Sequence, residues 1–215
     1  MLGIPMISPL FQVQDVIDSP SKIAILRVLA SRKGFKATGR EIARLSGFSV
    51  PATHESLKNL HARNILDLEI IGKQHIYSLN EDDRIVQKII RPMFVAESGV
   101  KEEVRDFLLR EIKTSGIQQD IVSLILYGSA QKDSARENSD VDIAVVVHKA
   151  VNIEPVKNVF ISTVMSKFKA YFGAQLDIYV KSAVEFRSLL KRNSPPVSTL
   201  IKSYSVLYGK EPLEV

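Results

Sequence analysis

The residues best suited to chemistry begin with two aspartates, Asp140 and Asp142, which come directly before the apolar run 143–147. Residues two apart on a β-strand point to the same face, and their Cα atoms are about 6.5 Å apart. Both carboxylates can therefore reach one divalent cation. Because Mg²⁺ prefers oxygen ligands and is usually held by a few carboxylates plus substrate phosphates, the spacing favours a magnesium–phosphate site.

A Gly-Ser pair precedes these aspartates in the chain. Gly128 and Ser129 follow the apolar run 121–127, and the polar segment 130–139 separates them from Asp140. Glycine lets a backbone approach a phosphate without a side-chain clash. Ser129 would add a hydroxyl and a backbone N–H at the start of a following helix, where anions bind well. The pair is therefore a candidate phosphate-binding turn.

A third carboxylate, Asp177, lies inside the apolar run 175–180. A lone charge in such a run is costly to bury unless it has a partner. A metal cluster shared with Asp140 and Asp142 would supply that partner. We therefore expect these three aspartates to meet on neighbouring strands.

The elements that must position these residues follow from hydrophobic periodicity. An apolar residue recurs at every fourth position from Val156 to Phe172, which predicts a helix that crosses between two strands. The predicted elements are helix 99–115, strand 121–127, strand 143–147, helix 154–172, strand 175–180, helix 183–192 and a closing segment 204–210.

The N-terminal third carries helix start and stop signals instead. Ser19-Pro20 opens a helix with proline in the first helical position. Thr38 and Glu41 have the spacing of a capping box, Gly47 ends that second helix, and Ser49 caps a third. Two short helices joined across a glycine have the length and turn of a helix-turn-helix.

A hairpin follows these helices. Residues 65–70 and 75–79 are predicted strands, and Gly72-Lys73 suits a two-residue turn with glycine first. Helix, helix-turn-helix and hairpin is the order of a winged helix. The segment 15–80 resembles the MarR-like and ArsR-like winged-helix repressors.

This resemblance implies DNA binding through the third helix and the hairpin tip. Residues 1–80 carry 10 basic and 6 acidic side chains, a net charge of +4, which also favours a polyanion. The alternative is a solvated helix face on a winged helix that binds protein. The candidate DNA contacts are Arg40, Arg44, Ser49, Thr53, His54, Lys58 and Lys73, with Gln74 and His75 beside Lys73 at the tip.

Strand-Gly-Ser, strand-Asp-x-Asp and a distant strand aspartate together resemble the DNA polymerase β-type nucleotidyltransferase superfamily, in its minimal branch, over residues 98–211. The resemblance implies a mixed sheet with flanking helices, and an α+β chain as a whole. It also implies transfer of a nucleoside monophosphate from an NTP, with ATP the expected donor. Asp140, Asp142 and Asp177 would then hold two Mg²⁺ ions, while Gly128 and Ser129 would bind the β- and γ-phosphates.

The sequence departs from that family after the Gly-Ser pair. The family often continues with a small residue, then Ala, Arg and Gly, where this chain has Ala130, Gln131, Lys132 and Asp133. Lys132 would replace arginine as a phosphate contact, as a point charge instead of a fork. Minimal nucleotidyltransferases often work with a HEPN-type partner, and the chain lacks that partner's Arg-x(4–6)-His motif, so such a partner would be a separate protein.

We therefore expect a winged helix at 1–80, a helical connector at 81–97 and a nucleotidyltransferase domain at 98–215. Arg91-Pro92 should kink or end the connector helix, which would either pair two protomers as a homodimer or pack between the domains. Two other functions stay open: a DNA-binding regulator whose second domain senses a nucleotide, and an interaction protein.

Composition excludes several classes of protein. The 215 residues include no cysteine, which rules out disulfides, zinc ribbons and cysteine nucleophiles. Hydrophobic residues are 45% and charged residues 25%, which is typical of a folded globular chain. No apolar run reaches the roughly 18 residues that span a bilayer, so we expect no membrane partner. The absence of cysteine fits an intracellular protein, and we expect a cytoplasmic one.

Overall fold

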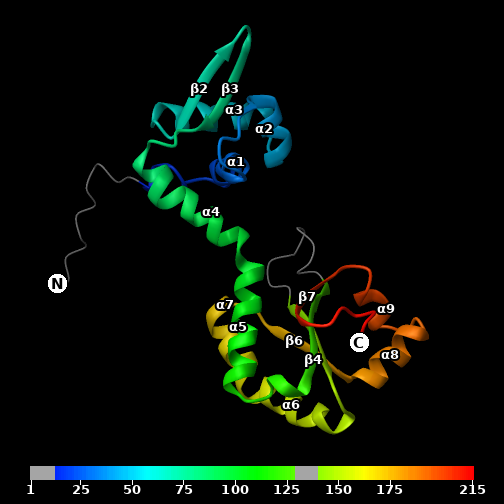
Figure 1. Cartoon of the computed structure of the whole chain (residues 1–215). Coiled ribbons are helices and arrows are strands. Elements are labelled where there is room, and N and C mark those ends of the chain that lie inside the picture. Colours follow the sequence, from blue (N-terminus) through cyan, green and yellow to red (C-terminus); the bar gives the residue numbers. More distant parts are fainter. Residues whose placement is uncertain (1–12, 129–139) are drawn as a thin grey trace, which may run out of the picture. The chain divides into compact units, whose positions relative to one another are not determined.

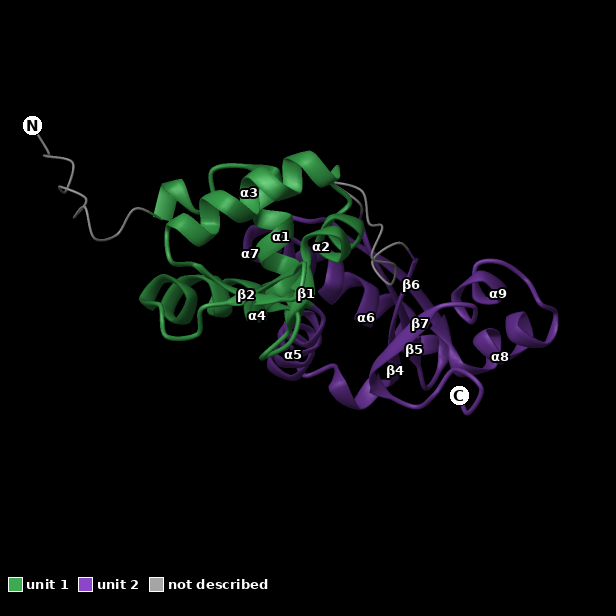
Figure 2. Ribbon diagram, turned by 90° about the horizontal axis from the view of Figure 1, so that it is seen from above, with its two compact units in different colours: residues 1–100 green, residues 101–215 purple. Residues whose placement is uncertain are grey.

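The computed structural model describes residues 13–128 and 140–215. The chain divides into two compact units, Met1–Val100 and Lys101–Val215, which Figure 2 shows in different colours. Each unit combines helices with its own sheet, so the expected α+β class is confirmed. No helix in the described part of the chain is long and apolar enough to cross a membrane.

The first unit has the element order of a winged helix-turn-helix. Its three-stranded antiparallel sheet has the order β1-β3-β2, and the β2–β3 hairpin extends beyond the helices (Figure 1). The elements are a 3₁₀ turn Val13–Asp15, α1 Pro20–Ala30, β1 Ala37–Thr38, α2 Gly39–Ser46, α3 Val50–Ala62, β2 Leu66–Ile71 and β3 Gln74–Leu79.

The predicted caps form this unit's helix starts. Ser19, Thr38 and Ser49 each accept a hydrogen bond from the backbone N–H three residues later, which satisfies a donor that the first helical turn leaves free. Gly47 ends α2 in the left-handed conformation at φ 74°. The predicted helix boundaries are therefore confirmed at these points, whereas the two-residue strand β1 was not predicted.

The segment predicted as a separate connector belongs to the first unit. A π-helical turn, Val86–Ile90, leads directly into α4, Arg91–Ser98. Pro92 lies in the first turn of α4, so the helix continues past it, where we had expected a kink or an end. Val86, Ile90 and Phe94 are buried with the winged-helix core. The Arg91 guanidinium donates to the carbonyl oxygen of Ala30 at 2.9 Å, which ties α4 to α1.

The second unit is built on a four-stranded mixed sheet of order β6-β5-β4-β7. β5 and β6 are parallel, and the other neighbouring pairs are antiparallel. The elements are α5 Val100–Thr114, a 3₁₀ turn Gln118–Asp120, β4 Ile121–Tyr127, β5 Val141–Val147, a 3₁₀ turn Ala150–Asn152, α6 Ile153–Val159, a π-helical turn Phe160–Val164, α7 Met165–Phe172, β6 Leu176–Ser182, α8 Ala183–Lys191, α9 Val197–Leu200 and β7 Tyr204–Gly209.

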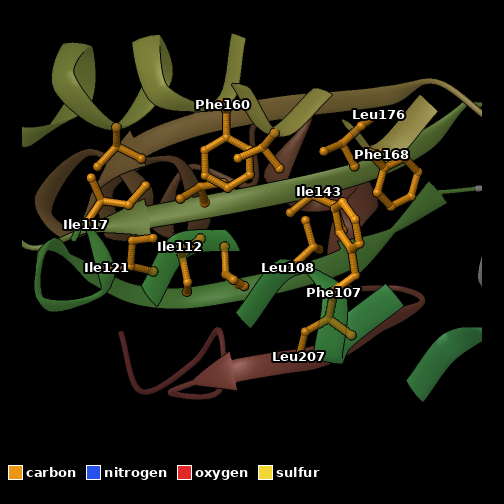
Figure 3. Packing of buried hydrophobic residues seen from close by; sticks show 14 of the residues in the cluster. Phe107, Leu108, Ile112, Ile117, Ile121, Ile143, Phe160, Phe168, Leu176 and Leu207 are labelled. Carbon is orange, nitrogen blue, oxygen red and sulfur yellow. The ribbon is translucent and has the colours of Figure 1, made fainter. Parts of the chain in front are cut away.

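Helices cover both faces of this sheet (Figure 1). On one face α5 and α6–α7 pack around Phe107, Phe160 and Phe168, a cluster that Figure 3 shows from close by. On the other face α8 and α9 pack against β4 and β5 through a second cluster that includes Phe186 and Val146. The parallel β5–β6 pair needs a crossover, which α6–α7 supplies where helix 154–172 was predicted.

Candidate functional site

Two of the three predicted aspartates lie side by side at one end of the second unit's sheet. Asp142 on β5 is in register with Asp177 on β6, and on its other side with Tyr127 on β4. Tyr127 is in turn in register with Tyr204 on β7. Residues in register on adjacent strands share a face, so the four side chains form one row across the sheet.

This row lies on the sheet face that α8 and α9 cover. Asp142 alternates with Ala144 and Val146, both of which pack in the cluster with those helices. The row is at the sheet end where β4 finishes and β5 and β6 begin. Asp140 comes just before β5 and is exposed. The carboxylates therefore stand at the margin of a packed face, where a ligand from solvent can reach them.

Gly128 fits closely against Asp142. Its φ of +78° is left-handed, and a methyl group added to its Cα would lie 2.0 Å from the Asp142 Oδ2 atom and 2.9 Å from Cγ. No larger residue can take this position without moving the carboxylate. Gly128, which the sequence predicts as a phosphate contact, thus lies directly against the Asp142 carboxylate.

Burial and like charges together raise the cost of ionising Asp142. Burial raises the pKa of the Asp142 carboxyl, and the neighbouring Asp177 and then Asp140 raise it further. None of the ion pairs found among the described residues involves any of these three aspartates. A bound cation would relieve this repulsion, which is the arrangement expected of carboxylates that share a metal.

Three tyrosines join the carboxylates on this face and were missed in the sequence. Burial, followed by the charges of Asp142 and Asp177, raises the pKa of Tyr127 to about 12. Tyr127, Tyr179 and Tyr204 all pack at the edge of the α8–α9 cluster. The signal was available, because Tyr179 is two residues from Asp177 on β6, and Tyr127 directly precedes Gly128.

The first unit offers a second candidate site, a cleft of about 440 Å³ between α2, α3 and the β2–β3 hairpin. Among the predicted DNA contacts it brings together Arg40, His54 and Lys73. Arg44, Ser49 and Lys58 are exposed but do not line it. The residues that line it are Thr38, Gly39, Arg40, Val50, His54, Lys73, Gln74, His75 and Tyr77.

The prediction that Thr53 faces DNA is wrong. Its side chain is fully buried, at 0% exposure, on the same helix stripe as Leu57 and Leu60. Its Oγ1 atom has no hydrogen-bond partner within the part of the chain that the structure describes. Thr53 therefore belongs to the core of the winged helix, and the surface of α3 is presented by His54 and Lys58.

Residues 110–211 match the family model described as Polymerase beta, Nucleotidyltransferase. That range contains the row of Tyr127, Asp142 and Asp177 together with Gly128. The second unit is a polymerase β-type nucleotidyltransferase domain. The family recognised from the Gly-Ser, Asp-x-Asp and strand-aspartate pattern is thereby confirmed for this part of the chain.

Comparison with solved structures gives several transcriptional regulators among its matches. A predicted DNA-binding transcriptional regulator from E. coli is 17% identical, covers 41% of this chain and 84% of its own, and has a TM-score of 0.34. The homodimeric winged helix-turn-helix DNA-binding domain of a possible ArsR-family transcriptional regulator from Mycobacterium bovis is 16% identical, with coverages of 42% and 76% and a TM-score of 0.32. The AntR antimony-specific transcriptional repressor is 16% identical, with coverages of 48% and 93% and a TM-score of 0.34. Comparison with curated proteins gives no match.

The nucleotidyltransferase domain departs from the predicted site in one respect. Asp177 is the second residue of β6 and is exposed, so the prediction that it is a buried lone charge is wrong. Asp177 lies beside Asp142 because β6 is in register with β5, not because its side chain is buried. The predicted phosphate contacts Ser129 and Lys132 lie outside the described residues.

The carboxylates of this domain fit Mg²⁺ in donor chemistry, since all three supply oxygen ligands. Within residues 13–128 and 140–215, however, no three His, Asp or Glu side chains are gathered closely enough to form a complete metal site. Mg²⁺ is usually bound by one or two carboxylates plus substrate phosphates instead of an all-protein cage. The arrangement therefore fits a metal that arrives with a nucleotide.

Proposed function

We propose that the chain is a Mg²⁺-dependent nucleotidyltransferase that transfers a nucleoside monophosphate from an NTP, with ATP the expected donor, to an acceptor hydroxyl. The observation that carries this proposal is the register of Asp142 with Asp177 beside a glycine that touches the Asp142 carboxylate. The family match over residues 110–211 supports the same reaction class.

In the proposed reaction the acceptor oxygen forms a bond to the α-phosphorus. The bond from the α-phosphorus to the bridging oxygen breaks, and pyrophosphate leaves. Asp177, exposed at the start of β6, would accept the hydroxyl proton. Gly128, with Ser129, would let the β- and γ-phosphates approach the backbone. Asp140, Asp142 and Asp177 would hold Mg²⁺, which would neutralise phosphate charge.

Substitution of one carboxylate tests the proposal. Purified protein is incubated with Mg²⁺, each α-labelled NTP and host lysate as the source of acceptor. We expect Asp142→Asn to lower transfer at least about 100-fold, because the site acts through charge and position. Asp106→Asn is the matched control, since Asp106 is an exposed aspartate on α5, and its rate should equal that of the wild type. Full transfer by Asp142→Asn would refute the assignment.

We further propose that the winged helix binds DNA. Support comes from the cleft, where Arg40 and Lys73 are fixed charges, and His54 and His75 add ring N–H donors. Backbone phosphates supply most of the affinity in such interfaces, and the affinity falls with salt. A homodimer and a separate HEPN-type protein are the further proposed partners, which sedimentation velocity and co-purification would test.

One observation favours a second function, a DNA-binding regulator whose nucleotidyltransferase domain senses a nucleotide or binds a partner protein. After the Gly-Ser pair the sequence departs from the family pattern at Gln131, Lys132 and Asp133, as a domain that binds NTP without turnover would allow. Binding of NTP with Mg²⁺ in calorimetry, together with no label transferred to any acceptor, would select this function over catalysis.

A further inference from the structure

The hairpin of the winged helix carries an apolar residue that its own core does not cover. Leu66 and Leu68 on β2 face the same side as their register partners on β3, Leu79 and Tyr77, and pack against the core. Ile70 is the next residue on that side of β2, yet its side chain is 63% exposed. The hairpin thus continues its core-facing row past the helices into solvent.

A cleft with two fixed positive charges, Arg40 and Lys73, borders the neighbouring strand β3. Ile70 is in register with His75, which lines the cleft together with Arg40 and Lys73. No carboxylate is among the described residues that line the cleft. The opposite side of the hairpin carries Glu69, which pairs with Lys36 at 2.9 Å. The Glu69 carboxylate is thus paired on the other side of the hairpin, and the side that bears Ile70 suits a polyanion.

We propose that Ile70 packs against the deoxyribose edge of a DNA duplex whose phosphates occupy the adjacent cationic cleft. This inference rests on the proposed DNA binding and adds an apolar contact to it. A DNA backbone alternates phosphate with apolar sugar carbons, so an isoleucine in register with His75, at the edge of a cleft that Arg40 and Lys73 also line, matches both parts. Apolar side chains such as isoleucine are also used as wedges by proteins that contact the minor groove.

The contact has a distinct expected signature. Burial of a side chain of this size is worth about tenfold in the dissociation constant, by the usual area relation. Because Ile70 carries no charge, its loss should leave the dependence of affinity on salt unchanged. Loss of Lys73, a phosphate contact, should instead reduce the slope of log K against log salt by about 1.

Ile71 provides a matched control for Ile70. The two are neighbours on β2, Ile71 is 54% exposed, and alternation places it on the opposite side of the hairpin. Ile70→Ser and Ile71→Ser remove the same side chain and the same strand preference. Binding is measured by fluorescence anisotropy at several salt concentrations, with a labelled duplex that the wild-type protein enriches from a random-sequence library, and thermal melting confirms the fold.

We expect Ile70→Ser to bind about tenfold more weakly with an unchanged salt slope, Ile71→Ser to stay within about twofold, and Lys73→Ala to flatten the slope. Equal losses in the two serine variants, or no loss in Ile70→Ser, would overturn the Ile70 contact while DNA binding stood. Failure of the wild type to enrich any duplex would overturn DNA binding and this contact together, and it would leave nucleotidyl transfer unaffected.

Discussion

Replacement of Gly128 by alanine should abolish the proposed nucleotidyl transfer without unfolding the domain. The added methyl would meet the Asp142 Oδ2 atom at 2.0 Å, whereas optimal contacts are about 3.5–4.0 Å. The neighbouring Asp142 Cγ and Cβ atoms would lie at 2.9 and 3.2 Å, so the carboxylate has to move by more than about 1 Å. Misplacement of a reacting group by that distance can cost about 100-fold in rate.

The stability cost of this substitution can be separated from the clash. At φ +78° alanine costs roughly 1–2 kcal/mol, and its smaller unfolded-state entropy offsets about 0.4–1 kcal/mol. The net strain of about 1 kcal/mol should lower the melting temperature of this unit by about 3–6 °C. Gly173 has φ +70° and no atom within 4 Å of an added methyl, so Gly173→Ala carries the strain without the clash.

Transfer of labelled NMP and thermal melting are the two assays for this pair. We expect Gly128→Ala to lose about 100-fold in transfer, and Gly173→Ala to transfer at the wild-type rate with a smaller fall in melting temperature, because it carries the backbone strain without the clash. In an Asp142→Ala background the stability cost of Gly128→Ala should fall toward that of Gly173→Ala, as a coupled pair requires. Equal transfer by the two alanine variants would refute a site built on the Gly128–Asp142 contact.

Three further substitutions test how individual side chains contribute to the stability of the fold. Burial and like charges raise the pKa of Asp142, so its contribution to stability is fully present below the unfolded pKa of 3.8 and is lost as the pH rises through the folded pKa. In EDTA, the melting temperature of Asp142→Asn should therefore equal that of the wild type near about pH 3. Near about pH 7 it should be higher than that of the wild type. Thr53→Val removes an unpaired buried hydroxyl and should raise the free energy of unfolding by about 1 kcal/mol in urea titrations. Ser123→Ala removes the bond that the buried Ser123 hydroxyl donates to the Lys210 carbonyl at 2.7 Å, and should lower it by about 1 kcal/mol.

Much of the fold was predictable because local signals determined it. The caps at Ser19, Thr38 and Ser49 act within one helical turn. The four-residue apolar spacing that starts at Val156 describes one face of a helix from its own sequence. The two-residue strand β1 is different, because it exists only through its pairing with β3. Its sequence, Ala37-Thr38, is too short to show any period.

The residue types of the site could be predicted from the sequence, but their positions relative to one another could not. The register of β5 with β6 sets Asp177 beside Asp142, and register is a property of the assembled sheet. Thr53, by contrast, could have been excluded from the DNA contacts. It lies four residues before Leu57 and seven before Leu60, so the 3.6-residue period puts all three on one side of α3.

The nucleotidyltransferase domain carries locally destabilising features at the place where its chemistry is expected. Asp142 is partly buried with two like charges near it, and Gly128 takes a left-handed conformation in close contact with it. Elsewhere this domain has stabilising local features, such as the complete capping box that Ser182 and Glu185 form at the start of α8. Local conflicts of this kind persist when a function requires them. Asp142→Asn should therefore be more stable than the wild type and also inactive, which a merely structural aspartate would not be.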